Sequence, residues 1–185
     1  MKNIIIKNYK ENYFKTFQKL KEANILKLVS LIRKSLDKRI YICGNGGSAA
    51  NSNHIANDFT YMVNNNKKKK IKIESFSANS SIITCLANDI GYEKIYSYQL
   101  LTKGKKGDLL IVLSGSGNSK NIINVLKTAK KLGINTFAVV GYNGGKAKKI
   151  ANNNIHFKID DMQIAEDLQL TLFHICAKIL RKQKF

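Results

Sequence analysis

The chain has 185 residues, and its 32 Lys and Arg against 12 Asp and Glu give a formal net charge of +20. This length suits one substantial hydrophobic core, and no apolar run approaches the roughly 20 residues that a membrane span needs. Residues 1–7 lack a long hydrophobic region and a small-residue cleavage site, so we expect no signal peptide. Three cysteines without a CxxC spacing argue against a disulfide framework and favour the cytoplasm.

The positive charge raises the question of a nucleic-acid partner. Only Arg33, Arg39 and Arg181 supply the guanidinium fork that groove recognition favours, and the lysines are spread along the chain with one cluster at residues 67–70. No known nucleic-acid-binding signature is present. We therefore expect neither nucleic acid nor a membrane as the main partner, and the same positive field suits an anionic phosphate substrate.

Strand and helix patterns alternate along the chain. In the first half of the chain we predict a helical segment over residues 9–36, a strand over 39–43, a helix over 49–61 and a weaker strand over 70–76. Short helices are expected over 79–87 and 92–101, around a turn at 88–91. The second half is predicted to hold a strand over 108–113, a helix to 132, a strand over 135–140, a short helix from 144, a strand over 154–159 and a closing helix over 162–183. This order predicts one α/β domain over residues 1–185, with an N-terminal helix and a doubly wound, mostly parallel sheet flanked by helices. The architecture expected is a three-layer, flavodoxin-like sandwich.

Two loops rich in glycine and serine follow predicted strands and precede predicted helices. The first is Gly44 to Ser48 and the second is Ser114 to Ser119. In open α/β sheets ligands bind at the carboxyl ends of the strands, where helix N-termini offer free N–H groups and a positive dipole end. The sequence therefore predicts an anion site, with additional donors from the serine hydroxyls.

Three other readings of these loops fail. The Gly44-x-Gly46-x-x-Ala49 spacing fits the loosest dinucleotide fingerprint, but the segment about 20 residues further on is Met-Val-Asn-Asn-Asn and holds no acid. No Walker lysine follows the glycines. A nucleophile elbow needs a glycine two residues before its serine, and Ser116 has Ser114 there.

One histidine shares a predicted helix with a nearby carboxylate. His54 and Asp58 are four residues apart on the helix after the first loop, so they share a face and could hold a metal ion together. A lone histidine on a helix is more often structural, and this pairing shifts the interpretation towards function. His156 lies in a strand pattern and receives no role.

Four motifs, in order along nearly the whole chain, resemble those of one family. They are Cys43 to Asp58 (Cys-Gly-Asn-Gly-Gly-Ser-Ala-Ala-Asn-Ser-Asn-His-Ile-Ala-Asn-Asp), Cys85 to Tyr92, Leu113 to Ser119, and the closing helix with His174. Together they resemble the sugar isomerase (SIS) domain family and, within it, the phosphoheptose isomerases. Each motif alone is weak evidence, and the combination is specific.

The resemblance implies which residues bind substrate. They are Asn45, Gly46, Gly47, Ser48, Asn88, Asp89, Ser114, Gly115, Ser116 and Ser119. The family usually has Ser-Thr-Ser where this chain has Ser-Gly-Ser, so one hydroxyl is missing from the second loop.

The resemblance also implies a zinc ion in each active site, with His54, Asp58, Glu166 and His174 as ligands, and catalysis by Asp58, Glu166 and His174. The family has Glu at the position of Asp58 and Gln at that of Glu166. We hypothesise that the two changes compensate, with Asp58 favouring the metal and Glu166 taking proton transfer. Eight residues of helix, about 12 Å, separate Glu166 from His174, so a shared ion needs a neighbouring subunit. The resemblance implies a homotetramer with active sites at subunit interfaces.

The activity implied is aldose–ketose isomerisation, most simply of sedoheptulose 7-phosphate to D-glycero-D-manno-heptose 7-phosphate for surface polysaccharide. Asp58 or Glu166 would be the base, His174 the acid, and His54 a ligand or orienting group. The alternatives are a non-catalytic SIS-domain adaptor that binds a replication initiator protein and a protein that senses sugar phosphates. Because the chain keeps Asp58, Glu166 and His174, we favour the enzyme.

Overall fold

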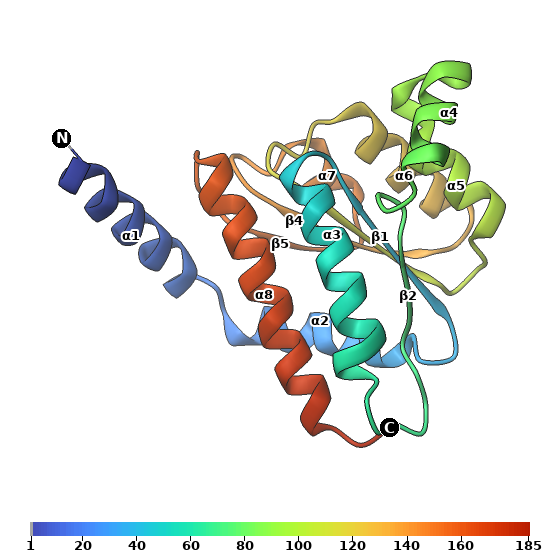
Figure 1. Ribbon diagram of the computed structural model, residues 1–185, viewed down its shortest axis with the longest axis horizontal. Helices are drawn as coiled ribbons and strands as arrows, with labels where there is room; N and C mark the ends of the chain where they lie inside the picture. The colour runs from blue at the N-terminus through green and yellow to red at the C-terminus, as the bar shows by residue number, and fades with distance from the viewer. Residues whose placement is uncertain (1) are drawn as a thin grey trace.

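A parallel sheet forms the middle layer of the protein, as the computed structural model of residues 2–185 shows (Figure 1). Its strands are β1 (Arg39–Gly44), β2 (Lys72–Ser75), β3 (Leu109–Ser114), β4 (Asn135–Val140) and β5 (Asn153–His156). They lie in the order β2-β1-β3-β4-β5, and each neighbouring pair is parallel. This is the doubly wound, flavodoxin-like order, so the predicted fold class is confirmed.

The central strands are apolar on both faces because helices cover both. All six residues of β3 are buried. Successive side chains of a strand point to opposite faces, so Ile111 joins the core on one side of the sheet and Leu110 the core on the other. The continuous apolar runs of the sequence therefore correspond to strands buried between two layers.

Two groups of helices form the outer layers (Figure 1). One face carries α1 (Lys2–Gln18), α2 (Glu22–Lys34), α3 (Gly47–Asp58) with the π-helical turn Phe59–Val63, and α8 (Met162–Lys182). The other carries α4 (Ser80–Ile90), the 3-10 turn Tyr92–Lys94, α5 (Ile95–Lys103), α6 (Lys120–Lys131) and α7 (Gly145–Ile150). The neighbours α3 and α8 pack along their length, which brings their side chains together near the sheet edge that holds the two loops.

Two predicted segments differ in kind from the structure, and the strand expected over residues 154–159 ends earlier, at His156. The helical segment expected over residues 9–36 is two helices, because α2 packs its apolar face on the sheet while α1 leaves the body and contacts α8. The Tyr9 hydroxyl donates to Asp167 Oδ2 at 2.5 Å. The hydroxyls of Tyr13 and Thr171 share a hydrogen bond at 2.7 Å. The turn expected at residues 88–91 is the last turn of α4, and the chain reverses only at Gly91, whose φ of 98° favours glycine.

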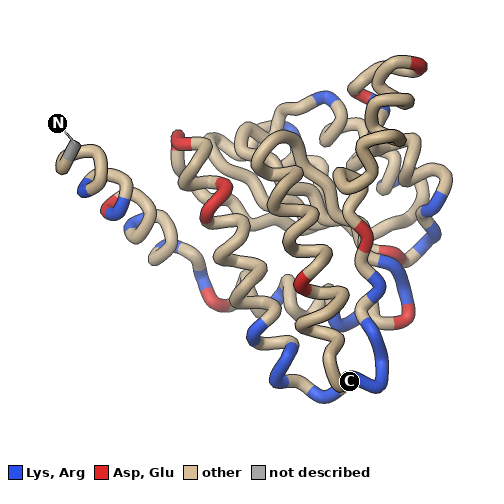
Figure 2. The backbone as a smooth tube through the Cα atoms, viewed as in Figure 1, with Lys and Arg blue, Asp and Glu red and all other residues tan. Residues whose placement is uncertain are grey.

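Basic residues gather around the C-terminus (Figure 2). The backbone N–H groups of Lys68 and Lys69 donate to the Phe185 carbonyl at 3.2 and 3.4 Å, and the Lys67 ammonium donates to the Arg181 carbonyl at 2.8 Å. These cations lie at the C-terminal end of α8, where the helix dipole favours positive charge. Within residues 2–185, no helix combines the length and the apolar character that a membrane crossing requires.

Gly133 ends α6 in the left-handed conformation, with a φ of 66°. We expect Gly133→Ala to lower the free energy of unfolding by about 1–2 kcal/mol, because a Cβ is disfavoured at this φ. Urea denaturation measures the change. Lys127→Ala, on the same helix, is the control and should leave stability nearly unchanged; equal effects of the two substitutions would contradict the assignment.

Candidate active site

The two predicted loops meet at the carboxyl ends of β1 and β3, which are neighbouring strands. They enclose a cavity of about 380 Å³. Its lining comprises Asn45, Gly46, Gly47, Ser48, Ser114, Gly115, Ser116, Ser119, Met162 and Glu166. Eight of the ten residues predicted to bind substrate thus line one cavity, together with Glu166 from α8.

Both loops present helix N-termini to this cavity. Gly46 and Ser119 are the N-cap residues of α3 and α6. Within the second loop, Ser114 Oγ accepts a hydrogen bond from Gly117 N–H at 3.1 Å and Ser116 Oγ accepts one from Asn118 N–H at 3.2 Å. The serine oxygens therefore brace the loop, while their hydroxyl protons remain able to donate to a bound anion.

Glycine is required at the back of the second loop. Gly117 has a φ of 65°, and a Cβ there would lie 2.2 Å from the Gly144 carbonyl oxygen. The close approach lets the loop before α7 pack directly on the loop before α6. Any larger residue would push the second loop out of place.

Glu166 reaches the cavity from the first turns of α8. Its Oε1 accepts a hydrogen bond from the Ser48 N–H at 3.0 Å, at the N-terminus of α3. A Cβ on Gly47 would lie 2.2 Å from Glu166 Oε2, so glycine at that position makes room for the carboxyl group. Burial raises the pKa of Glu166, and the hydrogen bond from Ser48 partly opposes that rise.

Asn88 and Asp89, also predicted to bind substrate, lie outside this cavity in a single chain. Both are exposed on α4, and Asn88 Nδ2 donates to Asp89 Oδ1 at 2.9 Å. Asp89 Oδ2 also lies 3.5 Å from the Cys85 thiol. One chain alone does not bring this pair to the two loops.

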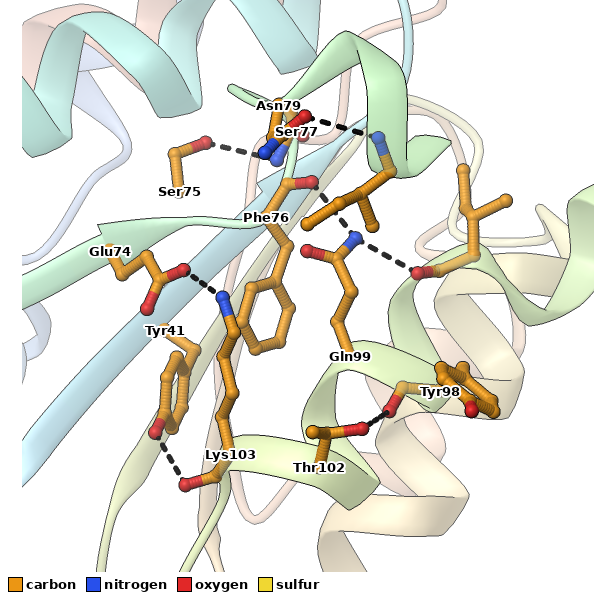
Figure 3. A network of polar contacts seen from close by, with 12 residues as sticks. Tyr41, Glu74, Ser75, Phe76, Ser77, Asn79, Tyr98, Gln99, Thr102 and Lys103 are labelled. Carbon is orange, nitrogen blue, oxygen red and sulfur yellow. Dashed lines mark hydrogen bonds and ion pairs between the residues drawn. The ribbon is translucent and has the colours of Figure 1, made fainter. Parts of the chain in front are cut away.

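A network of polar contacts fixes the segment that leads from β2 into α4 (Figure 3). Lys103 of α5 forms an ion pair with Glu74, and Gln99 donates to the Phe76 carbonyl at 3.2 Å. Further along, Asn79 Oδ1 caps the first turn of α4 by accepting from Ile82 N–H at 3.0 Å. Helix α4 is therefore anchored at its base.

The same segment also supports the first loop. Ser77 Oγ donates to the Gly44 carbonyl at 3.1 Å and accepts from the Gly44 N–H at 3.3 Å. The Tyr96 hydroxyl donates to the same carbonyl. The end of β1, just before the first loop, is thus held from two sides.

A second cluster lies further along α3 and α8. His54 Nε2 and His174 Nε2 are 3.0 Å apart, and Asp58 Oδ2 lies 3.5 Å from the first and 3.6 Å from the second. The three residues form this cluster within one chain. The imidazoles are close to half exposed, at 47% and 44%, so an ion could reach them from solvent.

The donor set of this cluster fits a transition metal. Two imidazole nitrogens and a carboxylate oxygen are ordinary zinc ligands, and a tetrahedral zinc site separates neighbouring ligand atoms by about 3.3 Å. The observed separations of 3.0, 3.5 and 3.6 Å lie around that value. His54, Asp58 and His174 could therefore hold a metal ion with a fourth position open.

Glu166 stands apart from this cluster in a single chain, because its carboxyl group contacts Ser48 instead. Of the four predicted metal ligands, the structure brings three together without a second subunit. The metal role of Glu166 stays a prediction that requires a second copy of the chain.

Sequence reasoning missed three residues near the cavity. Met162, the first residue of α8, lines it. Asn121 of α6 pairs with Asn45, and the Tyr92 hydroxyl donates to Asn45 Oδ1 at 3.2 Å. Asn121 stands two residues after the second loop, but its sequence position does not distinguish it from other helix residues, and all three contacts depend on tertiary packing.

The family follows from comparison with known proteins. The model of the SIS domain matches residues 7–141. A phosphoheptose isomerase from Helicobacter pylori (strain Shi470) is 34% identical over 178 residues, covering 94% of this chain and 91% of that protein. One from Clostridium acetobutylicum is 33% identical over 176 residues, covering 95% and 89%. The chain therefore belongs to the SIS domain family and, within it, to the phosphoheptose isomerases.

The fold agrees with a solved structure of such a protein. Phosphoheptose isomerase GmhA from Neisseria gonorrhoeae superposes with a TM-score of 0.87 at 24% identity, covering 96% of this chain and 95% of that one. The resemblance expected from the sequence motifs is confirmed.

The raised pKa of Glu166 predicts a pH-dependent stability. Between the ordinary value of 4.5 and the raised value, the folded state binds the proton more tightly than the unfolded chain, so stability falls as pH rises through this window. Glu166→Gln keeps an acceptor for Ser48 and removes the titration. We expect E166Q to be more stable than wild type at neutral pH, with the difference shrinking on acidification towards 4.5.

Urea denaturation of both proteins from about pH 4 to about pH 8 measures their free energies of unfolding. The difference between the two values cancels the titration of all groups that the proteins share. A difference that stays constant over this range would contradict the raised pKa.

Proposed function

We propose that the protein is an aldose–ketose isomerase that converts sedoheptulose 7-phosphate to D-glycero-D-manno-heptose 7-phosphate. Its relatives are named phosphoheptose isomerases. The observation that carries the proposal is the cavity itself, where two helix N-termini and a carboxyl group of raised pKa surround one space. An anion site beside an acid–base group is what isomerisation of a sugar phosphate requires.

The phosphate binds the second loop in this proposal. The Ser48 N–H at the N-terminus of α3 already donates to Glu166, and a dianion placed beside that carboxyl group would be repelled. The loop from Ser114 to Ser119 keeps its hydroxyl protons and the N-terminus of α6 for the phosphate. The sugar chain then extends towards Glu166, and phosphate binding supplies energy away from the reacting carbons.

Glu166 is the preferred base. It would take the proton from the carbon next to the carbonyl, giving an enediol, and return a proton to the neighbouring carbon. Burial brings its pKa closer to neutral pH, which suits a group that must both accept and release a proton. Asp58 is the alternative base and His174 the acid, as the family resemblance implies; His54 holds or orients.

The cluster of His54, Asp58 and His174 would hold zinc. Where a neighbouring subunit brings this cluster to the cavity, a bound zinc would polarise a carbonyl oxygen as a Lewis acid. Asp58 Oδ2 lies 3.5 and 3.6 Å from the two imidazole nitrogens, so its carboxylate would offset part of the charge of a bound zinc ion. This division, with Asp58 at the metal and Glu166 at the cavity, supports the compensation hypothesised for the two departures from the family pattern.

A homotetramer with active sites at subunit interfaces is part of the proposal. None of the residues of α4, all of them described, is buried in one chain, although the helix is rich in Ile and Leu. Helix α1 extends away from the body (Figure 1) and exposes Ile4, Ile5 and Phe14. Covering these surfaces with other copies would let α4 bring Asn88 and Asp89 to a neighbour's cavity. A cytoplasmic role in capsule or lipopolysaccharide synthesis stays a prediction.

The adaptor and sensor alternatives would need the two loops but would not need acid–base groups. The carboxyl group in the cavity and the His–Asp cluster favour the enzyme.

Turnover tests the proposed function. Incubation with sedoheptulose 7-phosphate should yield the aldose, and removal of metal with a chelator should lower the rate. We expect Glu166→Gln to lower kcat by about 10²–10⁴-fold, the usual value of general acid–base catalysis. A folded wild-type protein without product would favour the adaptor.

Zinc content tells the metal ligands apart from the base. We expect His54→Ala and His174→Ala to lose bound zinc, measured by atomic absorption, because each removes one of three ligands. His156→Ala is the matched control, since His156 contacts Lys148 and Tyr142 instead. Loss of turnover in Asp58→Asn with normal zinc content would place the base at Asp58.

A further inference from the structure

Two amide side chains join the loops across the cavity wall. Asn45 Nδ2 donates to Asn121 Oδ1 at 2.9 Å, and Asn121 Nδ2 donates back to Asn45 Oδ1 at 2.8 Å. Asn45 belongs to the first loop and lines the cavity, whereas Asn121 is the second residue of α6 and is 2% exposed. The pair connects segments 76 residues apart in the sequence.

The backbone fixes which way these amides point. Asn121 Oδ1 also accepts a hydrogen bond from the Ile122 N–H at 2.9 Å. A backbone N–H can only donate, so an amide turned by 180° would place two donors against each other. Asn121 must therefore direct its Nδ2 to Asn45, and Asn45 must direct its Oδ1 back.

As a result, the side-chain amide of Asn45 has a fixed orientation and offers a hydrogen-bond donor of its own. Its Oδ1 accepts from both Asn121 and the Tyr92 hydroxyl, and one Nδ2 proton is given to Asn121. The second Nδ2 proton is not used in these contacts. Since Asn45 lines the cavity, this proton is available to an oxygen atom of a bound sugar.

We propose that Asn121 is a positioning residue for the isomerase reaction: through the reciprocal amide pair it sets the spacing of the two substrate loops and makes Asn45 a fixed hydrogen-bond donor. The inference rests on the proposed function. Asn121 acts through Asn45 and does not itself line the cavity.

A double-mutant cycle tests this role. The four proteins are wild type, Asn45→Ala, Asn121→Ala and the double variant, each assayed for kcat/KM with sedoheptulose 7-phosphate and for zinc content. We expect N121A to lower kcat/KM by about 10²-fold, the scale of a misplacement of about 1 Å in an active site, with zinc unchanged. Because Asn121 acts through Asn45, N121A should cost nothing further in the N45A background.

Lys127→Ala is the control. Lys127 lies on the same helix with an exposed side chain and does not line the cavity, so K127A should keep the wild-type kcat/KM. Asn121→Leu keeps a branched side chain of four heavy atoms without polar atoms and replaces N121A if truncation prevents folding. Thermal denaturation of every variant records stability separately from activity.

Equal losses from N121A in the wild-type and N45A backgrounds would overturn the proposal, as would an N121A protein with wild-type kcat/KM. An inactive wild type would instead refute the proposed function. The amide pair would then be judged from the Kd for inorganic phosphate in the same four proteins, where the same non-additive loss is expected and additive losses would refute it.

Discussion

The structure depends on the meeting of two helix N-termini at the ends of adjacent strands. β1 and β3 are paired in register up to Gly44 and Leu113, so the loops that follow them must open at the same edge of the sheet. Each loop then turns into a helix, α3 or α6, whose first N–H groups lack partners within the helix. The pairing of two buried strands thus concentrates hydrogen-bond donors in one cavity, and an anionic ligand is the chemical consequence.

Helix α8 carries the carboxyl and imidazole groups of the proposed site. Its first turns bring Glu166 to the N-terminus of α3, and its middle brings His174 to His54 and Asp58. One pair of packed helices therefore carries two separate groups of candidate functional side chains, about 12 Å apart along α8. The carboxyl group at the cavity and the carboxylate between the imidazoles have different surroundings, which lets similar groups take different roles.

Most of the fold could be predicted from the sequence, and so could the two loops that line the cavity. The strand expected over residues 135–140 has those bounds, since a buried parallel strand leaves a continuous apolar run. The split between α1 and α2 could not be foreseen, because both helices continue one apolar spacing and only packing separates them. Asn121 looked like an ordinary helix residue, and its contact with Asn45 exists only once β1 and β3 pair. The convergence of His54 and His174 likewise depends on how α3 packs against α8.

Exchange of a substrate proton with solvent tests whether the base lies in this cavity. In deuterium oxide, an enzyme that forms an enediol at this cavity should place deuterium on the carbon next to the carbonyl of sedoheptulose 7-phosphate, and nuclear magnetic resonance detects it. We expect wild type to incorporate the label and Glu166→Gln to do so far more slowly. Wild-type incorporation that is undiminished in the Glu166 variant would contradict the placement of the base in this cavity.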